Sequence, residues 1–177
     1  MGTSAFRKRS THMSPYLRNL FGEEIPPEKK KITILSIEAK YRKEVVREDA
    51  PAWVSKRYTA PSQVFEMFQD LRMEAKEHFI ALHMDGKNRI SCLDRISVGS
   101  LNQSIVHPRE VFKTACLSSA AAILLIHNHP TGDPTPSRED MEITRRLKEA
   151  GDLLGIKILD HIIIGDSYLS FVEQGLL

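Results

Sequence analysis

A run of seven small or aliphatic residues, 120–126, leads directly into the sequence His127-Asn128-His129-Pro130. A short apolar run without charges is typical of a strand that is buried on both faces. Because side chains in a strand alternate between its faces, histidines two positions apart point the same way. The sequence therefore predicts a central strand whose end presents two imidazoles on one face.

The segment after these histidines is predicted to bring the chain back to the end of the strand. Residues 130–136 are rich in proline and glycine and predict a loop. Ser137 follows as a natural helix N-cap, and Asp140 lies three residues later in the first helical turn. We therefore expect Asp140 to lie close to His127 and His129.

Two imidazole nitrogens and a carboxylate oxygen form a donor set that suits Zn²⁺. Three protein ligands leave one coordination position for water, as in catalytic zinc sites. We predict one Zn²⁺ per chain, bound by His127, His129 and Asp140. The histidines also have a simpler interpretation as polar turn residues, and Asp140 as an acid that interacts with the helix dipole while it ligates a metal.

An activated water also needs a group that accepts its proton. Glu77 directly precedes the apolar residues 78–84, at the rim of the predicted sheet, and is the candidate base. Glu74 is its rival, but it lies in the charged segment 72–76 and is expected to be solvated. Ser137 is the candidate donor to an oxyanion, with helix capping as the alternative role.

The remaining elements alternate between strands and helices. This order predicts an α+β fold with α/β-type layering, in which helices flank a mixed sheet. We expect one or two strands within 31–47, a loop over 47–58, a helix from residue 61, a hairpin of residues 78–84 and 89–98, helices over 107–117 and 137–154, and strands over 157–164 and 168–172.

One further histidine lies inside a predicted strand. His161 belongs to the otherwise apolar segment 157–164. We interpret it as a core histidine bonded to Asp160, with a supporting role behind the metal ligands as the alternative.

Charge is distributed unevenly along the chain, although the net charge is only +2. Residues 1–31 hold seven lysines and arginines against three glutamates, which could contact nucleic acid or an acidic partner. We interpret residues 1–30 as a basic, flexible tail, residues 31–58 as N-terminal strands and a loop, and residues 59–177 as the domain that carries the histidine motif.

Composition also bears on the compartment. No segment approaches the roughly 20 apolar residues that span a membrane, and the N-terminus lacks the apolar stretch of a signal peptide. Cys92 and Cys116 do not form a CxxC pair. These features predict a cytoplasmic protein with no membrane partner.

The chain resembles the JAMM (MPN+) metalloproteases, and the RadC-like proteins in particular, over about residues 60–177. The resemblance rests on His127-Asn128-His129-Pro130-Thr131-Gly132-Asp133-Pro134-Thr135-Pro136-Ser137-x-x-Asp140, supported by Gly99-Ser100-Leu101-Asn102, His107-Pro108-Arg109-Glu110 and Asp160-His161-Ile162-Ile163-Ile164-Gly165.

The resemblance implies a cytidine-deaminase-like JAMM/MPN fold and hydrolysis of a peptide or isopeptide bond, with a protein or peptide as substrate. It implies that His127, His129 and Asp140 bind zinc, that Glu77 activates the water and that Ser137 stabilises the oxyanion. Asn128 stands where deubiquitinating members have Ser or Thr, and long insertions are absent, so ubiquitin cleavage is not implied.

Two other functions compete with the peptidase. One is a catalytically silent MPN-type interaction module, and the other is a DNA-associated RadC-like protein. RadC-like proteins carry an N-terminal helix-hairpin-helix module that binds DNA, and residues 1–60 show no such glycine-bearing hairpin. The sequence also lacks the HExxH motif of thermolysin-like enzymes and the motif pair of zinc deaminases.

Overall fold

In the computed structural model of the chain, strand β5 (Ala122–Asn128) lies in the middle of a five-stranded sheet with the order β4-β3-β5-β6-β7. It is antiparallel to β3 (Glu77–Met84) and parallel to β6 (Lys157–Ile164). Every residue of β5 is buried. The predicted central strand and the mixed α+β sheet are therefore confirmed.

The hairpin of β3 and β4 (Ile90–Gly99) forms one edge of the sheet. Asn88 adopts the left-handed conformation in its turn, with φ of 57°, which asparagine tolerates better than most residues. At the other edge, β7 (Tyr168–Ser170) pairs antiparallel with β6. The hairpin and the closing strand pair were both predicted.

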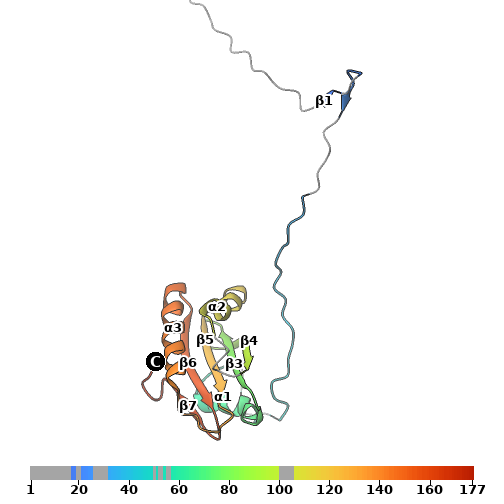
Figure 1. Cartoon of the computed structure of the whole chain (residues 1–177). Helices are drawn as coiled ribbons and strands as arrows, with labels where there is room; N and C mark the ends of the chain where they lie inside the picture. Colours follow the sequence, from blue (N-terminus) through green and yellow to red (C-terminus); the bar gives the residue numbers. More distant parts are fainter. Residues whose placement is uncertain are drawn as a thin grey trace, which may run out of the picture. The chain divides into compact units, whose positions relative to one another are not determined.

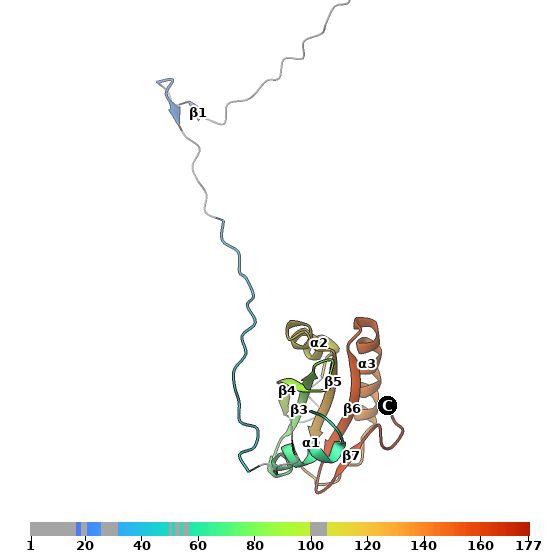
Figure 2. The same cartoon turned by 180° about the vertical axis from the view of Figure 1, so that it is seen from behind.

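Helices cover both faces of the sheet. Helix α1 (Pro61–Phe68), followed by the 3₁₀ helix η1 (Gln69–Met73), packs on one face, and α2 (Pro108–Leu117) and α3 (Arg138–Leu154) pack on the other. Figure 1 and Figure 2 show α2 and α3 side by side, with α3 running along β6. The α1 face buries Val64, Phe68, Ile80, Leu82, Met84, Leu124, Ile126, Ile162 and Ile164, and the α2/α3 face buries Phe79, Ala81, Val111, Phe112, Ala115, Ile123, Leu125 and Leu147.

The ends of α3 follow directly from its sequence. Ser137 is the N-cap, and Ser137 and Asp140 bond each other's backbone N–H in a capping box. Gly155 ends the helix in the left-handed conformation, with φ of 71°. Because Asp140 is part of the cap, its carboxyl group lies at the start of α3, next to the end of β5.

The structure describes residues 17–18, 21–25, 32–49, 51, 54, 57–99 and 106–177, which form two units, Met1–Glu38 and Ala39–Leu177. Most of the predicted basic tail, residues 1–30, therefore lies outside the described residues. Within the first unit, Leu17–Arg18 (β1) pairs with Glu24–Ile25 (β2). Among the described residues, no helix combines the length and the apolar character needed to cross a membrane.

The prediction of strands within residues 31–47 is wrong. Residues 32–45 contain no strand, and Ile32, Ile34, Leu35 and Ile37 are between 86% and 99% exposed. Their alternation places apolar side chains on both sides, so it does not define a single face to bury. A lone extended segment also has no ladder of hydrogen bonds to stabilise it.

Candidate metal centre

The three predicted ligands come together where β5 ends and α3 begins. His127 is the penultimate residue of β5, His129 follows the strand directly, and Asp140 lies in the first turn of α3. One ligand atom from each lies within 4.8 Å of the others. The alternation of the strand and the capping of the helix thus produce the predicted cluster.

The ligand atoms face one another at short distances. Nε2 of His127 lies 2.9 Å from Nε2 of His129 and 3.1 Å from Oδ1 of Asp140. Nε2 of His129 lies 3.4 Å from Oδ2 of Asp140. Ligands about 2.0–2.1 Å from a tetrahedral metal are about 3.3 Å apart, so the three side chains have the spacing of one coordination sphere.

The two carboxylate oxygens of Asp140 have different partners. Oδ2 accepts hydrogen bonds from the Ser137 N–H and hydroxyl, both at 2.7 Å. Oδ1 is buried and accepts none. Burial alone raises the pKa of Asp140, but the adjacent imidazoles and Ser137 hold this pKa well below its usual range, so the group is a carboxylate with one unsatisfied oxygen.

The proton of His129 can be placed from its hydrogen bond. Its Nδ1 lies 2.7 Å from the main-chain oxygen of Asp133. A carbonyl oxygen only accepts, so Nδ1 carries the proton and the neutral ring has a lone pair on Nε2. Burial lowers the pKa of His129, but the bonds to Asp140 and to the Asp133 carbonyl outweigh it and raise this pKa overall.

Behind His127 lies a second imidazole. Nδ1 of His127 is 2.8 Å from Nε2 of His161, and Nδ1 of His161 is 2.6 Å from the Thr144 hydroxyl. His161 is fully buried, and this burial, with the neighbouring His127, holds its pKa well below the usual range. The ring of His161 therefore supports a predicted metal ligand.

The expected bond between His161 and Asp160 is present, but it does not involve the imidazole ring. Only the main-chain N–H of His161 bonds to Oδ1 of Asp160. Consecutive residues of a strand point to opposite faces. The Asp160 carboxylate accordingly bonds the Ser170 hydroxyl on one side of β6, while the His161 ring faces His127 on the other.

A cation is the natural occupant of this cluster. Oδ1 of Asp140 is buried without a hydrogen-bond donor and lies 3.1 Å from Nε2 of His127, and a buried acceptor without a donor is costly. A divalent metal held by this oxygen and by Nε2 of the two histidines would give it a partner. The residues present therefore fit a metal site.

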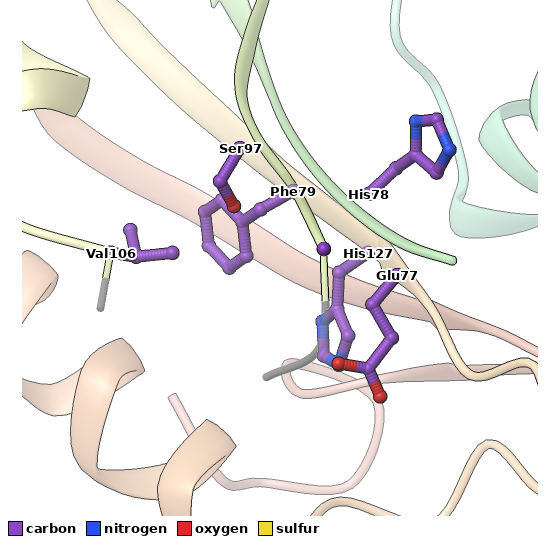
Figure 3. Close-up of a pocket in the computed structure, with 7 residues that line it drawn as sticks. Glu77, His78, Phe79, Ser97, Val106 and His127 are labelled. Atoms are coloured by element: carbon purple, nitrogen blue, oxygen red, sulfur yellow. The ribbon is translucent and has the colours of Figure 1, made fainter. Parts of the chain in front are cut away.

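Glu77 opens β3, the strand next to β5. Phe79 pairs with His127, and continuation of this antiparallel register places Glu77 opposite His129. Figure 3 shows the Glu77 carboxylate beside the His127 ring, while His78 points to the other side of the strand. Glu77 is half-buried, and its negative charge helps to raise the pKa of His129.

The rival base is placed elsewhere. Glu74 follows η1, its side chain is 55% exposed, and its carboxylate lies 3.7 Å from Nε2 of His78. Because His78 points away from the ligand cluster, Glu74 does not share the site with His127. The expectation that Glu74 is solvated agrees with this position.

A small pocket of about 10 Å³, enough for about one water molecule, adjoins the ligand cluster. Figure 3 shows that Phe79, Ser97 and Val106 gather on one side of it, opposite Glu77 and His127. The pocket is lined by Glu77, His78, Phe79, Ser97, Gly99, Val106 and His127. The predicted base and a predicted metal ligand therefore line the same small pocket.

Asn128 lies between the two histidines and points to the opposite face of β5. Its Oδ1 accepts a hydrogen bond from the His78 N–H at 2.8 Å, and its Nδ2 donates to the carbonyls of Leu71 at 3.0 Å and Lys76 at 3.1 Å. The side chain is fully buried. Asn128 thereby holds the backbone that enters β3.

The loop after His129 is tied to the turn between β6 and β7. The His129 N–H donates to the Ile164 carbonyl at 2.9 Å, and the Asp166 N–H donates to the Gly132 carbonyl at 2.7 Å. A Cβ atom on Gly165 would lie 2.1 Å from the Gly132 oxygen. This close approach requires glycine at position 165.

Residues 58–176 match a family model described as the RadC-like JAB domain. The chain belongs to this family. The match confirms the resemblance to the RadC-like JAMM/MPN proteins, and the sheet flanked by three helices agrees with a JAB/MPN-like domain.

Curated relatives support the same family. A UPF0758 protein of Geotalea uraniireducens is 69% identical over 123 residues, which cover 68% of this chain and 54% of that protein. A UPF0758 protein of Geobacter sulfurreducens is 62% identical over 125 residues, or 70% of this chain and 55% of that protein. One from Methanosarcina mazei is 52% identical over 122 residues, or 68% and 53%. The chain spans about half the length of the curated relatives it matches.

Proposed function

We propose that the RadC-like JAB domain of this chain is a zinc-dependent peptidase that hydrolyses a peptide or isopeptide bond. The observation that carries the proposal is the convergence of one ligand atom each from His127, His129 and Asp140, all within 4.8 Å of one another, beside the Glu77 carboxylate. A ligand set with an open position next to a carboxylate base is the arrangement of metal-dependent hydrolases.

Zn²⁺ is the metal that best suits two imidazole nitrogens and one carboxylate oxygen in tetrahedral geometry. When bound, it lowers the pKa of a water molecule and polarises a carbonyl group. The protein supplies three ligands, and burial of His127 and Asp140, each with a side chain 1% exposed, excludes bulk water from the protein side of the site.

Glu77 is the group that moves the proton. Its carboxylate accepts a proton from the attacking water and then transfers it to the amine that leaves, so the proton is conserved over the reaction. Glu77 and His127 line the same small pocket, which supports this role because the base must lie beside the metal-bound water.

Ser137 is proposed to donate to the oxyanion. Its hydroxyl now donates to Oδ2 of Asp140, but that oxygen also accepts from the Ser137 N–H. Rotation of the hydroxyl therefore frees a donor for the substrate without leaving Oδ2 unpaired. The capping role of Ser137 is compatible with this second role.

Metal content tests the first half of the proposal. We expect about one zinc per wild-type chain by elemental mass spectrometry, and little in His129→Ala or Asp140→Ala. His107→Ala is the matched control, because His107 caps α2 and is not one of the clustered ligands. A folded wild-type protein that binds no zinc after zinc is added back would overturn the proposal.

Cleavage tests the second half. The zinc-loaded protein is incubated with a proteome-derived peptide library and with a lysine-linked isopeptide, and new amino termini are quantified by mass spectrometry. We expect Glu77→Gln to keep its zinc and to lose turnover, and Glu74→Gln to retain both. Zinc binding without any cleavage would instead favour the silent interaction module, and steeply salt-dependent DNA binding would favour the nucleic-acid function.

A further inference from the structure

Three short hydrogen bonds connect the back of His127 to the main chain of Asp140. The first joins Nδ1 of His127 to Nε2 of His161 at 2.8 Å, and the second joins Nδ1 of His161 to Oγ1 of Thr144 at 2.6 Å. The third joins Oγ1 of Thr144 to the carbonyl oxygen of Asp140 at 2.6 Å. The chain of bonds thus begins at one predicted metal ligand and ends at another.

The donor in each of the first two bonds follows from the third bond, between Thr144 and Asp140. Two oxygens 2.6 Å apart need a proton between them, and a carbonyl has none, so the Thr144 hydroxyl donates to Asp140. Thr144 then has only lone pairs for His161, so Nδ1 of His161 carries a proton. A fully buried imidazole disfavours a second proton. Nε2 of His161 therefore accepts from Nδ1 of His127.

With the donors assigned in this way, His127 carries its single proton on Nδ1 and has a lone pair on Nε2. Nε2 is the atom that faces His129 and Asp140. We propose that His161 and Thr144 are positioning residues, which hold the ring of His127 in one orientation and one tautomer for metal binding.

Packing restricts the same rings to one arrangement. The Phe79 ring stacks on His127 with centroids 5.9 Å apart and meets the edge of His161 at 5.5 Å. On its other side His161 stacks against Phe171 at 4.8 Å. With aromatic contacts on both sides, the His161 ring is fully buried, so bulk solvent does not offer its hydrogen bonds a substitute partner.

The two histidine ligands are therefore supported differently. His129 donates to a main-chain carbonyl of its own loop, at Asp133. His127 depends on side chains from α3 and β6, which the sequence places 17 and 34 residues away. Substitution of Thr144 or His161 consequently acts on His127 and leaves the support of His129 in place.

The inference rests on the metal site of the proposed function, but its test does not require catalysis. The imidazoles of the ¹⁵N-labelled, metal-free protein are examined by long-range ¹H–¹⁵N correlation NMR at about pH 8, above the ordinary imidazole pKa of about 6.5. We expect protonated Nδ1 and unprotonated Nε2 in both His127 and His161. A protonated Nε2 on either ring of the wild-type protein overturns the proposal.

Two substitutions of Thr144 separate its hydroxyl from its volume. Thr144→Val keeps the shape and removes the acceptor for Nδ1 of His161, so we expect protonated Nε2 to appear on His161 and His127. Thr144→Ser keeps the hydroxyl, and we expect it to retain the wild-type tautomers. The Ser variant therefore distinguishes a positioning role from a general effect of altered packing.

Zinc affinity provides the second measurement, by competition with a chromophoric chelator. We expect affinity to fall about 10- to 100-fold in Thr144→Val and to remain near wild type in Thr144→Ser. Unchanged His127 tautomers and zinc affinity in a folded Thr144→Val would overturn the inference. If Thr144→Val does not fold, two other measurements decide the question. These are the tautomers of His127 and His161 in the wild-type protein and the zinc affinity of His161→Phe.

The outcomes for the two proposals can be told apart. Correct tautomers and a Thr144-dependent affinity, without any peptide cleavage, support the positioning role and contradict only the peptidase. Cleavage that depends on Glu77, with zinc affinity insensitive to Thr144→Val, contradicts the positioning role alone.

Discussion

The side chain of Asn128 is hydrogen-bonded to the backbone on both sides of Glu77. It accepts from the His78 N–H at 2.8 Å and donates to the Lys76 carbonyl at 3.1 Å. The peptide groups that flank the predicted base are therefore held by the residue between the two predicted histidine ligands. This links the position of Glu77 to the strand that carries the two histidines.

Asn128→Ala should lower both stability and turnover without removing the metal. Loss of three buried hydrogen bonds leaves backbone groups unpaired, which we expect to cost about 2–4 kcal/mol in the free energy of unfolding. A displaced Glu77 should reduce kcat by about 10- to 100-fold. Urea unfolding, zinc content and the peptide assay measure the three quantities. A fall in activity that only parallels a loss of zinc would contradict this role.

Ser137→Gly separates helix capping from oxyanion stabilisation. Glycine is a tolerable N-cap, so we expect α3 to lose only a few tenths of a kcal/mol. Loss of the hydroxyl should reduce kcat by about 10²- to 10³-fold if it donates in the transition state. Thermal unfolding and steady-state kinetics report the two effects. Ser137→Gly with wild-type kcat would leave Ser137 a helix cap only.

Gly165→Ala should displace the loop that follows His129. The new Cβ atom would lie 2.1 Å from the Gly132 oxygen, so the backbone of the loop or of the β6–β7 turn must move. We expect a loss of about 1–3 kcal/mol in the free energy of unfolding and weaker zinc binding. Gly86→Ala in the β3–β4 turn is the control, because a Cβ atom there meets nothing within 4 Å. Equal effects of the two substitutions would contradict the expectation.

Asp85 should make stability depend on pH in the acid range. The backbone N–H groups of Arg89 and Lys87, and the Arg89 side chain, lower the pKa of Asp85 to about 2. In the unfolded chain its pKa is about 3.9. The unfolded state therefore binds the proton first, and the stabilisation that is complete above about pH 4 is lost as the pH falls toward 2.

Asp85→Asn tests this because it keeps Oδ1 and removes the charge. Urea unfolding between about pH 5 and 2 should show a flatter pH dependence for Asp85→Asn than for wild type. Asp152→Asn on the exposed side of α3 is the comparison, and we expect it to follow wild type. Parallel curves for Asp85→Asn and wild type would contradict the assignment.

The parts of the structure that could be predicted are those set by short-range patterns. The apolar run before His127 and the alternation of strand side chains place the two histidines on one face. The capping sequence of Ser137 and Asp140 places a carboxylate at the start of α3. These local rules were sufficient for the metal cluster, because each ligand lies at the end of a regular element.

The supporting residues could not be predicted because their partners are remote in the sequence. Thr144 bonds His161 from 17 residues away, and Asn128 bonds the Leu71 carbonyl from 57 residues away. The only local signal for His161 was a polar side chain in an apolar strand, which also fits a bond to Asp160. The register between β5 and β6 decides which partner it meets, with His161 opposite Leu125.

The hydrogen bonds that join the loop after His129 to β6 and to the β6–β7 turn limit where the protein can be truncated. Glu77, His127, His129, Ser137 and Asp140 all precede residue 141, so a fragment ending at Leu154 would contain the complete motif. It would lack His161, the Ile164 carbonyl that receives the His129 N–H, and the Asp166 N–H that holds Gly132. Such a fragment should carry every ligand and still bind metal poorly. The metal centre is a property of the completed sheet.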